Sequence, residues 1–154
     1  MSKQHRDTIL HMVRERNLPH KHDVHEPVRT SQEASDLRGV SMSSGAKAIV
    51  VRGKKSKESW LVVIPADRKV DMKTIQQVVG EKLSFHPDVE NEFDCEPGSV
   101  PPFGSVLGLQ TYADNNLEDT LNFNIGLRTD SLQISKTDYL SLETPILGNF
   151  SINL

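Results

Sequence analysis

Two apolar runs that flank a charged turn constrain the fold of this chain more than any other feature. Residues 46–52 (AKAIVVR) and 60–65 (WLVVIP) are rich in β-branched side chains, and the turn between them carries Lys54, Lys55 and Lys57. Such runs favour strands, and a short polar turn between two strands is typical of a β-hairpin. A hairpin alone is marginally stable in water, so the chain needs further strands or helices to cover it.

Capping signals predict helices around this hairpin. Thr30 and Glu33 form a capping box, in which the Thr30 hydroxyl accepts from the Glu33 amide, and Gly39 is expected to end that helix. Asp71 and Ser135 are suited to cap two later helices. Apolar spacing and turn residues predict the remaining elements, which are helices over residues 4–17 and 84–93 and strands within 20–28, 106–112, 121–124 and 131–135.

Strands in the middle of the chain with helices around them indicate an α+β fold. We expect a mixed, mostly antiparallel β-sheet or partly closed barrel that is flanked by helices. A chain of 154 residues can bury its own core, and no repeat or linker divides it, so a single domain over residues 1–154 is predicted.

Cys95 is the only cysteine, which excludes an intramolecular disulfide and a multi-cysteine zinc site. The carboxylates of its neighbours Asp94 and Glu96 disfavour a thiolate, which argues against a catalytic thiol. His20, His22 and His25 have a spacing that resembles a metal site, but no carboxylate arrangement or fourth ligand accompanies them. We therefore predict no metal and no cofactor, with the histidines exposed or lining a pocket.

Charge is unevenly distributed along the chain. Residues 1–82 carry 16 Lys and Arg against 10 Asp and Glu, whereas residues 83–154 carry 2 against 11. The asymmetry is compatible with nucleic acid approaching the basic half, although a solvated surface gives the same composition. No apolar stretch reaches the roughly 20 residues of a membrane span, and the first residues lack a signal-peptide core. We expect no membrane association and a cytoplasmic location.

Two further features are unusual. The stretch PGSVPPFG, residues 97–104, holds three prolines and two glycines, which can fix one turn and aim its remaining N–H groups. It is either a plain turn or a binding surface. Lys47 begins an apolar strand, where strand alternation normally places an apolar or small residue on the buried side. Taken alone, Lys47 is better explained as a side chain that reaches solvent.

Taken together, several short motifs resemble those of the YbaK/ProX family of aminoacyl-tRNA deacylases. SGAK precedes an apolar strand and is followed by VVIPAD, by GSVPPFG about fifty residues later, and by FNIG before the last strand. The order of the lysine and the proline–glycine loop is fairly specific, and the resemblance runs from about residue 25 to 142. The family includes editing domains of prolyl-tRNA synthetases, and the initial Met favours a free-standing protein here.

The resemblance implies hydrolysis of the ester that joins a wrong amino acid to the 3′ end of a tRNA, usually the tRNA for proline. It makes Lys47 the essential lysine and the Phe103 and Gly104 amides candidate donors to the oxyanion. A ribose hydroxyl of the tRNA would activate water without a covalent nucleophile, and His25 is the best base within the protein. The implied substrate-binding residues are His25, Gly98, Ser99, Pro102, Asn124, Gly126, Arg128 and Asp130.

The residues around the FNIG motif bear on the choice of substrate. Asn124 in FNIG is similar to members that act on alanine, yet the histidine that many of them carry after this glycine is absent, and Arg128 and Asp130 occupy the neighbourhood. Alanine or another small amino acid on tRNA for proline is predicted. Aminoacyl-tRNA is the expected partner and prolyl-tRNA synthetase a second candidate, and no oligomeric state is indicated. The alternative is a non-catalytic module that binds a tRNA end or a nucleotide in the same pocket.

Overall fold

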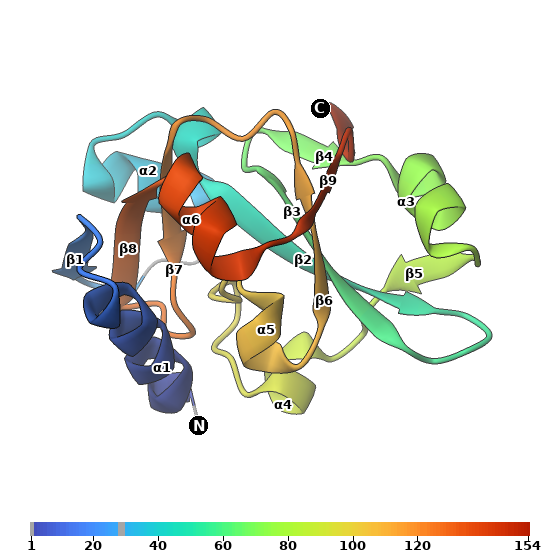
Figure 1. Ribbon diagram of the computed structural model, residues 1–154, viewed down its shortest axis with the longest axis horizontal. Coiled ribbons are helices and arrows are strands. Elements are labelled where there is room, and N and C mark those ends of the chain that lie inside the picture. The colour runs from blue at the N-terminus through green and yellow to red at the C-terminus, as the bar shows by residue number, and fades with distance from the viewer. Residues whose placement is uncertain (1, 28–29) are drawn as a thin grey trace.

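The computed structural model describes residues 2–27 and 30–154 and combines helices with three β-sheets (Figure 1). The helices are α1 (Ser2–Glu15), α2 (Ser31–Arg38), the 3₁₀ turn η1 (Met42–Ser44), α3 (Met72–Val79), α4 (Val89–Phe93), α5 (Gly104–Leu107) and α6 (Lys136–Glu143). The strands are β1 (Lys21–Val24), β2 (Ala46–Gly53), β3 (Ser59–Pro65), β4 (Arg68–Val70), β5 (Leu83–Phe85), β6 (Gln110–Asp114), β7 (Thr120–Asn124), β8 (Asp130–Ser135), β9 (Ile146–Gly148) and β10 (Ser151–Asn153).

The largest sheet is built on the predicted hairpin of β2 and β3. It has the strand order β5-β2-β3-β6-β9, in which β6 runs parallel to β3 and to β9 while the other pairs are antiparallel. A second sheet, β1-β8-β7, is antiparallel throughout, and β4 pairs with β10 in a third. The mixed, mostly antiparallel α+β class expected from the sequence is therefore confirmed.

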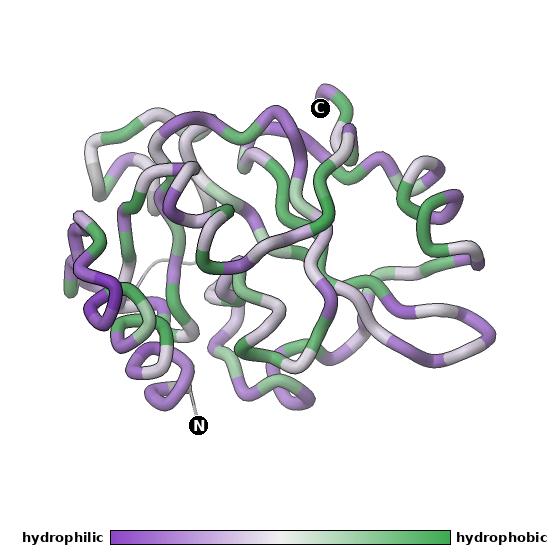
Figure 2. The backbone as a smooth tube through the Cα atoms, viewed as in Figure 1, coloured by the Kyte–Doolittle hydropathy of each residue, from purple (hydrophilic) through white to green (hydrophobic). Residues whose placement is uncertain are grey.

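The main core lies between the two larger sheets. One face of β2 and β3 supplies Val50, Leu61 and Val63, β7 and β8 supply apolar residues opposite them, and α1 adds Ile9 and Val13. Figure 1 shows α1 beside the three-stranded sheet and α6 lying across the middle of the molecule. In Figure 2 the hydrophobic segments concentrate along the strands, whereas the tip of the β2–β3 hairpin is hydrophilic.

A smaller core covers the other face of the five-stranded sheet. Val51, Val62 and Ile64 pack there with Ile75 of α3 and with Phe150 near the C-terminus. The five-stranded sheet is thus covered on both sides, which explains the continuous apolar runs of β2 and β3.

The predicted helix caps are confirmed. Thr30 accepts from the Glu33 amide, Asp71 from the Thr74 amide and Ser135 from the Asp138 amide. Gly39 ends α2 with a φ of 67°, a conformation that glycine adopts without steric cost. The strand expected within residues 20–28 is β1, although residue 28 lies outside the described residues.

Two local expectations are wrong. The strand predicted from residue 106 instead begins at Gln110, because residues 104–107 form α5 and Gly108 ends it with a φ of 77°. The helix predicted from residue 84 begins only at Val89, because Leu83–Phe85 pairs with β2 as an edge strand. Residues 83–85 follow the open edge of β2 over their local preference, and residues 104–107 are held by hydrogen bonds to Thr111 of β6 and Glu143 of α6.

Helices long and apolar enough to cross a bilayer do not occur in the described part of the chain.

Candidate active site

The three-stranded sheet has one apolar and one polar face. Its strand register pairs Ser131 with both Asn124 and Asp23, and directly paired residues point to the same side of a sheet. Residues two positions away share that side, so Asn122 and Gln133 extend the polar face. The opposite face carries the residues that enter the main core, namely Leu121, Phe123, Leu132 and Ile134.

A glycine connects this polar face to the hairpin. Gly45 forms a parallel bridge with Asn122, whose amide Nδ2 also donates to Ser44 Oγ at 3.1 Å. A Cβ at position 45 would lie 2.9 Å from the Cβ of Ala66, so only glycine permits this approach without a shift. Lys47 lies two residues beyond Gly45 and therefore shares the side of Asn122. The polar face thus continues onto the start of β2.

Lys47 is half-buried at this junction. It pairs with Ile64 of β3, and its Nζ donates to the carbonyl oxygen of Arg68 at 2.9 Å. Burial lowers the pKa of the Lys47 ammonium, and the negative charge of Asp67 opposes that shift. An ammonium has three protons, and this bond uses one of them. A partly desolvated cation of this kind interacts more strongly with an incoming anion than an exposed one does.

His25 and Ser131 form a pair on the same polar face. The Nδ1 atom of His25 lies 2.8 Å from the carbonyl oxygen of Glu26, and Nε2 lies 3.1 Å from Ser131 Oγ. Because a carbonyl oxygen can only accept, Nδ1 carries a proton, and in the neutral ring Nε2 accepts from the Ser131 hydroxyl. The backbone fixes His25 as well, since its amide donates to the carbonyl oxygen of Thr129 at 2.8 Å.

The first half of the proline–glycine loop is fastened to the turn after β7. The Gly126 amide donates to the Ser99 carbonyl at 2.9 Å, and the Glu96 amide donates to the Gly126 carbonyl at 3.1 Å. Asn124 holds the same turn, because its Nδ2 donates to the carbonyl oxygens of Leu127 and Asp130. Gly98 and Gly126 have φ values of 76° and 98°, which a side chain would strain. The structure therefore brings Gly98, Ser99, Asn124 and Gly126 together.

The second half of the loop is buried in the main core. Phe103 is fully buried and makes edge-to-face contacts with Phe123 and Tyr139. The Tyr139 hydroxyl donates to the carbonyl oxygen of Pro102 at 2.6 Å.

The Gly104 amide donates to Thr111 Oγ1 at 2.9 Å, and both residues are buried. This amide is therefore already engaged, contrary to the expectation that it faces an oxyanion.

Asp130 lies on the other side of β8, towards α1. Its carboxylate accepts from Thr129 Oγ1 at 2.7 Å and lies 2.8 Å from His22 Nε2 and 3.9 Å from Arg6 Nη1. Burial favours the neutral acid, but these hydrogen bonds and the Arg6 charge outweigh it and hold the pKa of Asp130 below its usual value. Asp130 thus anchors α1 to the sheet and does not face Lys47.

Arg128 lies beside the fastened turn. Its backbone amide donates to Glu96 Oε1 at 2.7 Å, and its Nε is buried with no hydrogen-bond partner among the described residues. Cys95, the buried residue that precedes Glu96, has its pKa raised to about 12 by burial and by the charges of Asp94 and Glu90. The expectation that this thiol is unreactive agrees with that value.

Ser131 and Asn122 were missed by the sequence reasoning. Their signal is the alternation of polar and apolar residues in β7 and β8, which predicts a sheet with one polar face. Within the described residues, no three His, Cys, Asp or Glu side chains are placed to share a metal ion.

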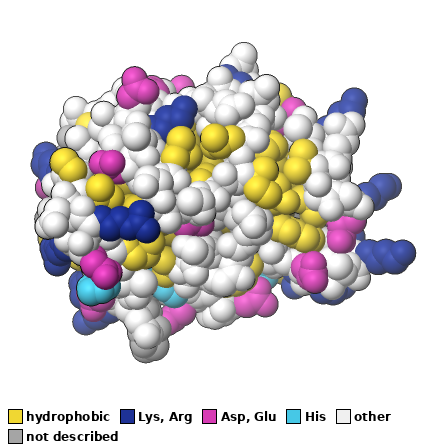
Figure 3. Space-filling view, in the orientation of Figure 1, with side chains coloured by type: hydrophobic (Ala, Val, Ile, Leu, Met, Phe, Trp, Pro, Cys, Tyr) yellow, Lys and Arg dark blue, Asp and Glu magenta, His cyan; other side chains and the backbone are white. Residues whose placement is uncertain are grey.

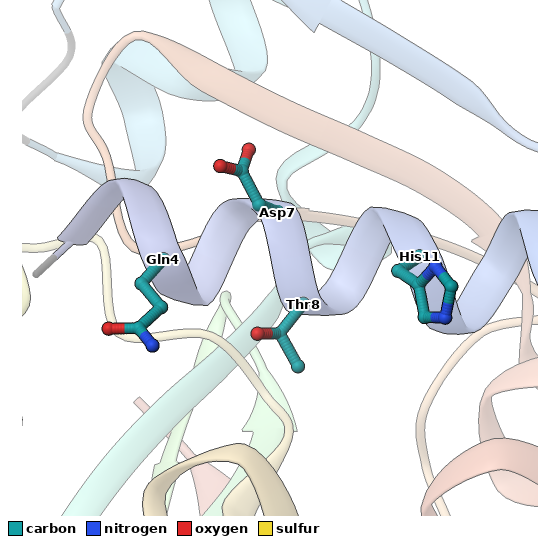
Figure 4. Close-up of a pocket in the computed structure, with 4 residues that line it drawn as sticks. All are labelled: Gln4, Asp7, Thr8 and His11. Carbon is teal, nitrogen blue, oxygen red and sulfur yellow. The ribbon is translucent and has the colours of Figure 1, made fainter.

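A shallow hollow beside α1 is lined by Gln4, Asp7, Thr8 and His11 (Figure 4). All four residues come from this one helix, and none belongs to the predicted site.

The chain matches the family model of the aminoacyl-tRNA editing domain over residues 25–142. It belongs to this family of aminoacyl-tRNA deacylases, as the motifs around Lys47 and the proline–glycine loop predicted.

Relatives and solved structures agree with this assignment. The chain is 31% identical over 135 residues to the multifunctional Ser/Thr-tRNA deacylase ProXp-y of Escherichia coli, and the aligned region covers 82% of this chain and 81% of the relative. It is 33% identical over 90 residues to the prolyl-tRNA editing protein ProX of Acetoanaerobium sticklandii, covering 56% and 54% of the two chains. The fold superimposes with a TM-score of 0.80 on a crystal structure of a trans-editing enzyme for prolyl tRNA synthetase, at 19% identity and with 99% and 98% of the chains covered.

Proposed function

We propose that this deacylase hydrolyses the ester that joins alanine, or another small amino acid, to the tRNA for proline. The observation that carries the proposal is the continuous polar face on which Lys47 lies with Asn124, Ser131 and His25. A separate editing site is needed for small amino acids because a synthetase pocket gains only about 1–3 kcal/mol per methylene group. The related proteins named for editing of prolyl-tRNA and for deacylation of Ser- and Thr-tRNA support this class of substrate.

Lys47 supplies the cation of the proposed site. An aminoacyl ester is already reactive, so the protein has to place it beside water and stabilise the negative charge that develops on its carbonyl oxygen. The half-buried ammonium of Lys47, held at 2.9 Å from the Arg68 carbonyl, has protons left for a phosphate or carbonyl oxygen of the substrate. Because the site is partly desolvated, that contact is stronger than the same contact in water.

His25 and Ser131 act as positioning residues in this proposal. Ser131 is 2% exposed and its hydroxyl is directed to His25 Nε2, so the pair holds the edge of the polar face in one arrangement. Water is activated by a ribose hydroxyl of the tRNA, as the sequence resemblance implies, and no acyl-enzyme forms. Ser131→Ala should therefore keep measurable hydrolysis.

The proposal is tested with tRNAs charged with alanine, cysteine, serine and proline, by following the loss of the ester. Wild-type protein should release alanine or another small amino acid from tRNA for proline, and Lys47→Ala should lower kcat/KM by about 100-fold or more. Lys69→Ala is the matched control, because Lys69 is an exposed lysine on the adjacent strand β4.

An unchanged rate for Lys47→Ala would remove the lysine from the mechanism. Binding of tRNA without turnover of any charged form would instead select the non-catalytic binding module.

A further inference from the structure

The tip of the β2–β3 hairpin is an ordered cluster of lysines. Lys54, Lys55 and Lys57 are all exposed there. The turn is closed by the Gly53 amide, which donates to the Glu58 carbonyl at 2.8 Å, and by the Lys57 amide, which donates to the Gly53 carbonyl at 3.0 Å. The three cationic side chains therefore project from a defined turn.

The loop that contains Glu81 and Lys82 adds a fourth lysine and is hydrogen-bonded to the turn. The Lys54 amide donates to the carbonyl oxygen of Lys82 at 2.9 Å, which holds the two loops together. Glu81 Oε1 accepts from the amides of Lys55 and Ser56 at 3.4 and 3.2 Å. Hydrogen bonds from Ser56 hold the pKa of Glu81 below its usual value. The Glu81 carboxylate is thus used to fix the backbone of the turn.

The lysine side chains outnumber the carboxylates around them, although the Glu81 carboxylate, which is held mainly by Ser56, also interacts with the charge of Lys55. In the part of the chain that the structure describes, none of the ion pairs involves Lys54, Lys55, Lys57 or Lys82. Residues 52–58 and 81–82 contain five cationic side chains and two carboxylates. Figure 3 shows Lys and Arg side chains at the end of the molecule where the hairpin projects. This end therefore presents a surplus of positive charge.

The lysine cluster is remote from the candidate active site. Lys47 and Lys54 lie on the same hairpin, seven residues apart, which corresponds to about 23 Å along an extended strand. When the ester of the substrate lies beside Lys47, a side chain at the tip is therefore too far away to contact it. A polynucleotide that enters the active site by its 3′ end has phosphates at such distances, whereas an isolated amino acid or nucleotide does not.

We propose that Lys54, Lys55, Lys57 and Lys82 form a docking surface for the phosphate backbone of the tRNA, away from its charged end. The inference rests on the proposed function, which supplies the polyanion. Each lysine that neutralises a phosphate releases bound counterions, so the contact strengthens binding and makes it dependent on salt. Because these contacts do not read bases, the surface contributes affinity and orientation, while the choice of amino acid remains with the active site.

The test compares two triple variants of equal charge change. The tip variant combines Lys54→Gln, Lys55→Gln and Lys57→Gln. The control variant replaces three exposed cations of α1 and the segment after it by Gln, namely Lys3, Arg14 and Arg16. Each protein is assayed on the full-length charged tRNA and on a short oligonucleotide that carries the same amino acid on its terminal adenosine. Urea unfolding verifies that both variants are folded.

The tip variant should show a KM for charged tRNA that is raised by about tenfold at 0.1 M salt, with kcat within about twofold of wild type. The slope of log KM against log salt should fall by about 2 to 3, as expected for three lost phosphate contacts. Its kinetics on the short oligonucleotide should match those of wild type, and the control variant should change by less than about threefold on either substrate.

Two results would overturn the docking surface while leaving the deacylase activity intact. One is an unchanged KM and salt slope for the tip variant, and the other is an equal loss in the control variant. If wild-type protein hydrolyses no ester at all, the proposed function fails. Binding of uncharged tRNA to the same three proteins then still decides whether the tip binds RNA.

Discussion

The buried carboxylate of Glu143 is expected to hold the second half of the proline–glycine loop in place. Glu143 is the last residue of α6 and is 7% exposed. Its Oε2 accepts from the Ser105 amide at 3.1 Å and from Thr111 Oγ1 at 2.6 Å, and its Oε1 accepts from Ser105 Oγ at 2.6 Å. Thr111 Oγ1 in turn accepts from the Gly104 amide. One side chain therefore satisfies the donors that fix α5.

Replacement of Glu143 by Ala removes all three hydrogen bonds. A hydrogen bond to a charged group contributes about 1.5–3 kcal/mol, and a buried donor left without an acceptor costs about 1–3 kcal/mol. Thr111 is 1% exposed and cannot turn to water, whereas Ser105 is exposed and can. Removing a buried carboxylate also relieves its desolvation, which offsets part of the loss. We therefore expect Glu143→Ala to lower the free energy of unfolding by about 3 kcal/mol.

Glu143→Gln is the matched control. The amide oxygen of Gln can keep the two bonds of Oε2, and its NH₂ group can donate to Ser105 Oγ, so the free energy of unfolding should fall by only about 1 kcal/mol. Urea unfolding at neutral pH measures both values. An Ala variant within about 0.5 kcal/mol of wild type, or a Gln variant as unstable as the Ala variant, would refute the reasoning.

Two further predictions follow from altered proton affinities. Burial lowers the pKa of Lys47 in the folded protein below the ordinary 10.5. Between the lowered pKa and 10.5, the unfolded chain therefore binds more protons than the folded one. The free energy of unfolding of wild type relative to Lys47→Met should therefore rise with pH up to about 10.5. Urea unfolding at several alkaline pH values measures this difference, and a difference that does not change with pH would contradict the effect of burial. The thiol of Cys95, with a pKa of about 12, should react with iodoacetamide at pH 8 at least about 100-fold more slowly in the folded protein than in urea, whereas equal rates would contradict its burial.

Elements that depend on near neighbours in the chain could be predicted from the sequence. The hydroxyl or carboxylate of Thr30, Asp71 or Ser135 bonds to an amide three residues later, so each cap is specified within one helical turn. The β2–β3 hairpin is equally local, because its two apolar runs are joined by a short polar turn. The family was also predictable, since its motifs are short segments in a fixed order.

Elements that depend on distant partners were mispredicted or missed. Residues 83–85 became a strand because β2 offered an open edge, and residues 104–107 became a helix because Thr111 and Glu143 hold its first turn. Whether a backbone amide is free to bind a substrate could not be predicted from the sequence either. The Gly104 amide looked free, but a threonine seven residues later occupies it.

The α+β class, the capped helices, the central hairpin and the family each depend on a pattern within a short stretch of chain, so the amino-acid sequence was enough to predict them. Which functional residues lie together depends instead on contacts between distant segments. The close approach at Gly45 joins β2 to β7, and strand register then places Lys47 on the side of Asn124 and Ser131 while it turns Asp130 towards α1. Side chains alternate between the two faces of a strand, so a register that is set by distant pairing determines what each residue can touch.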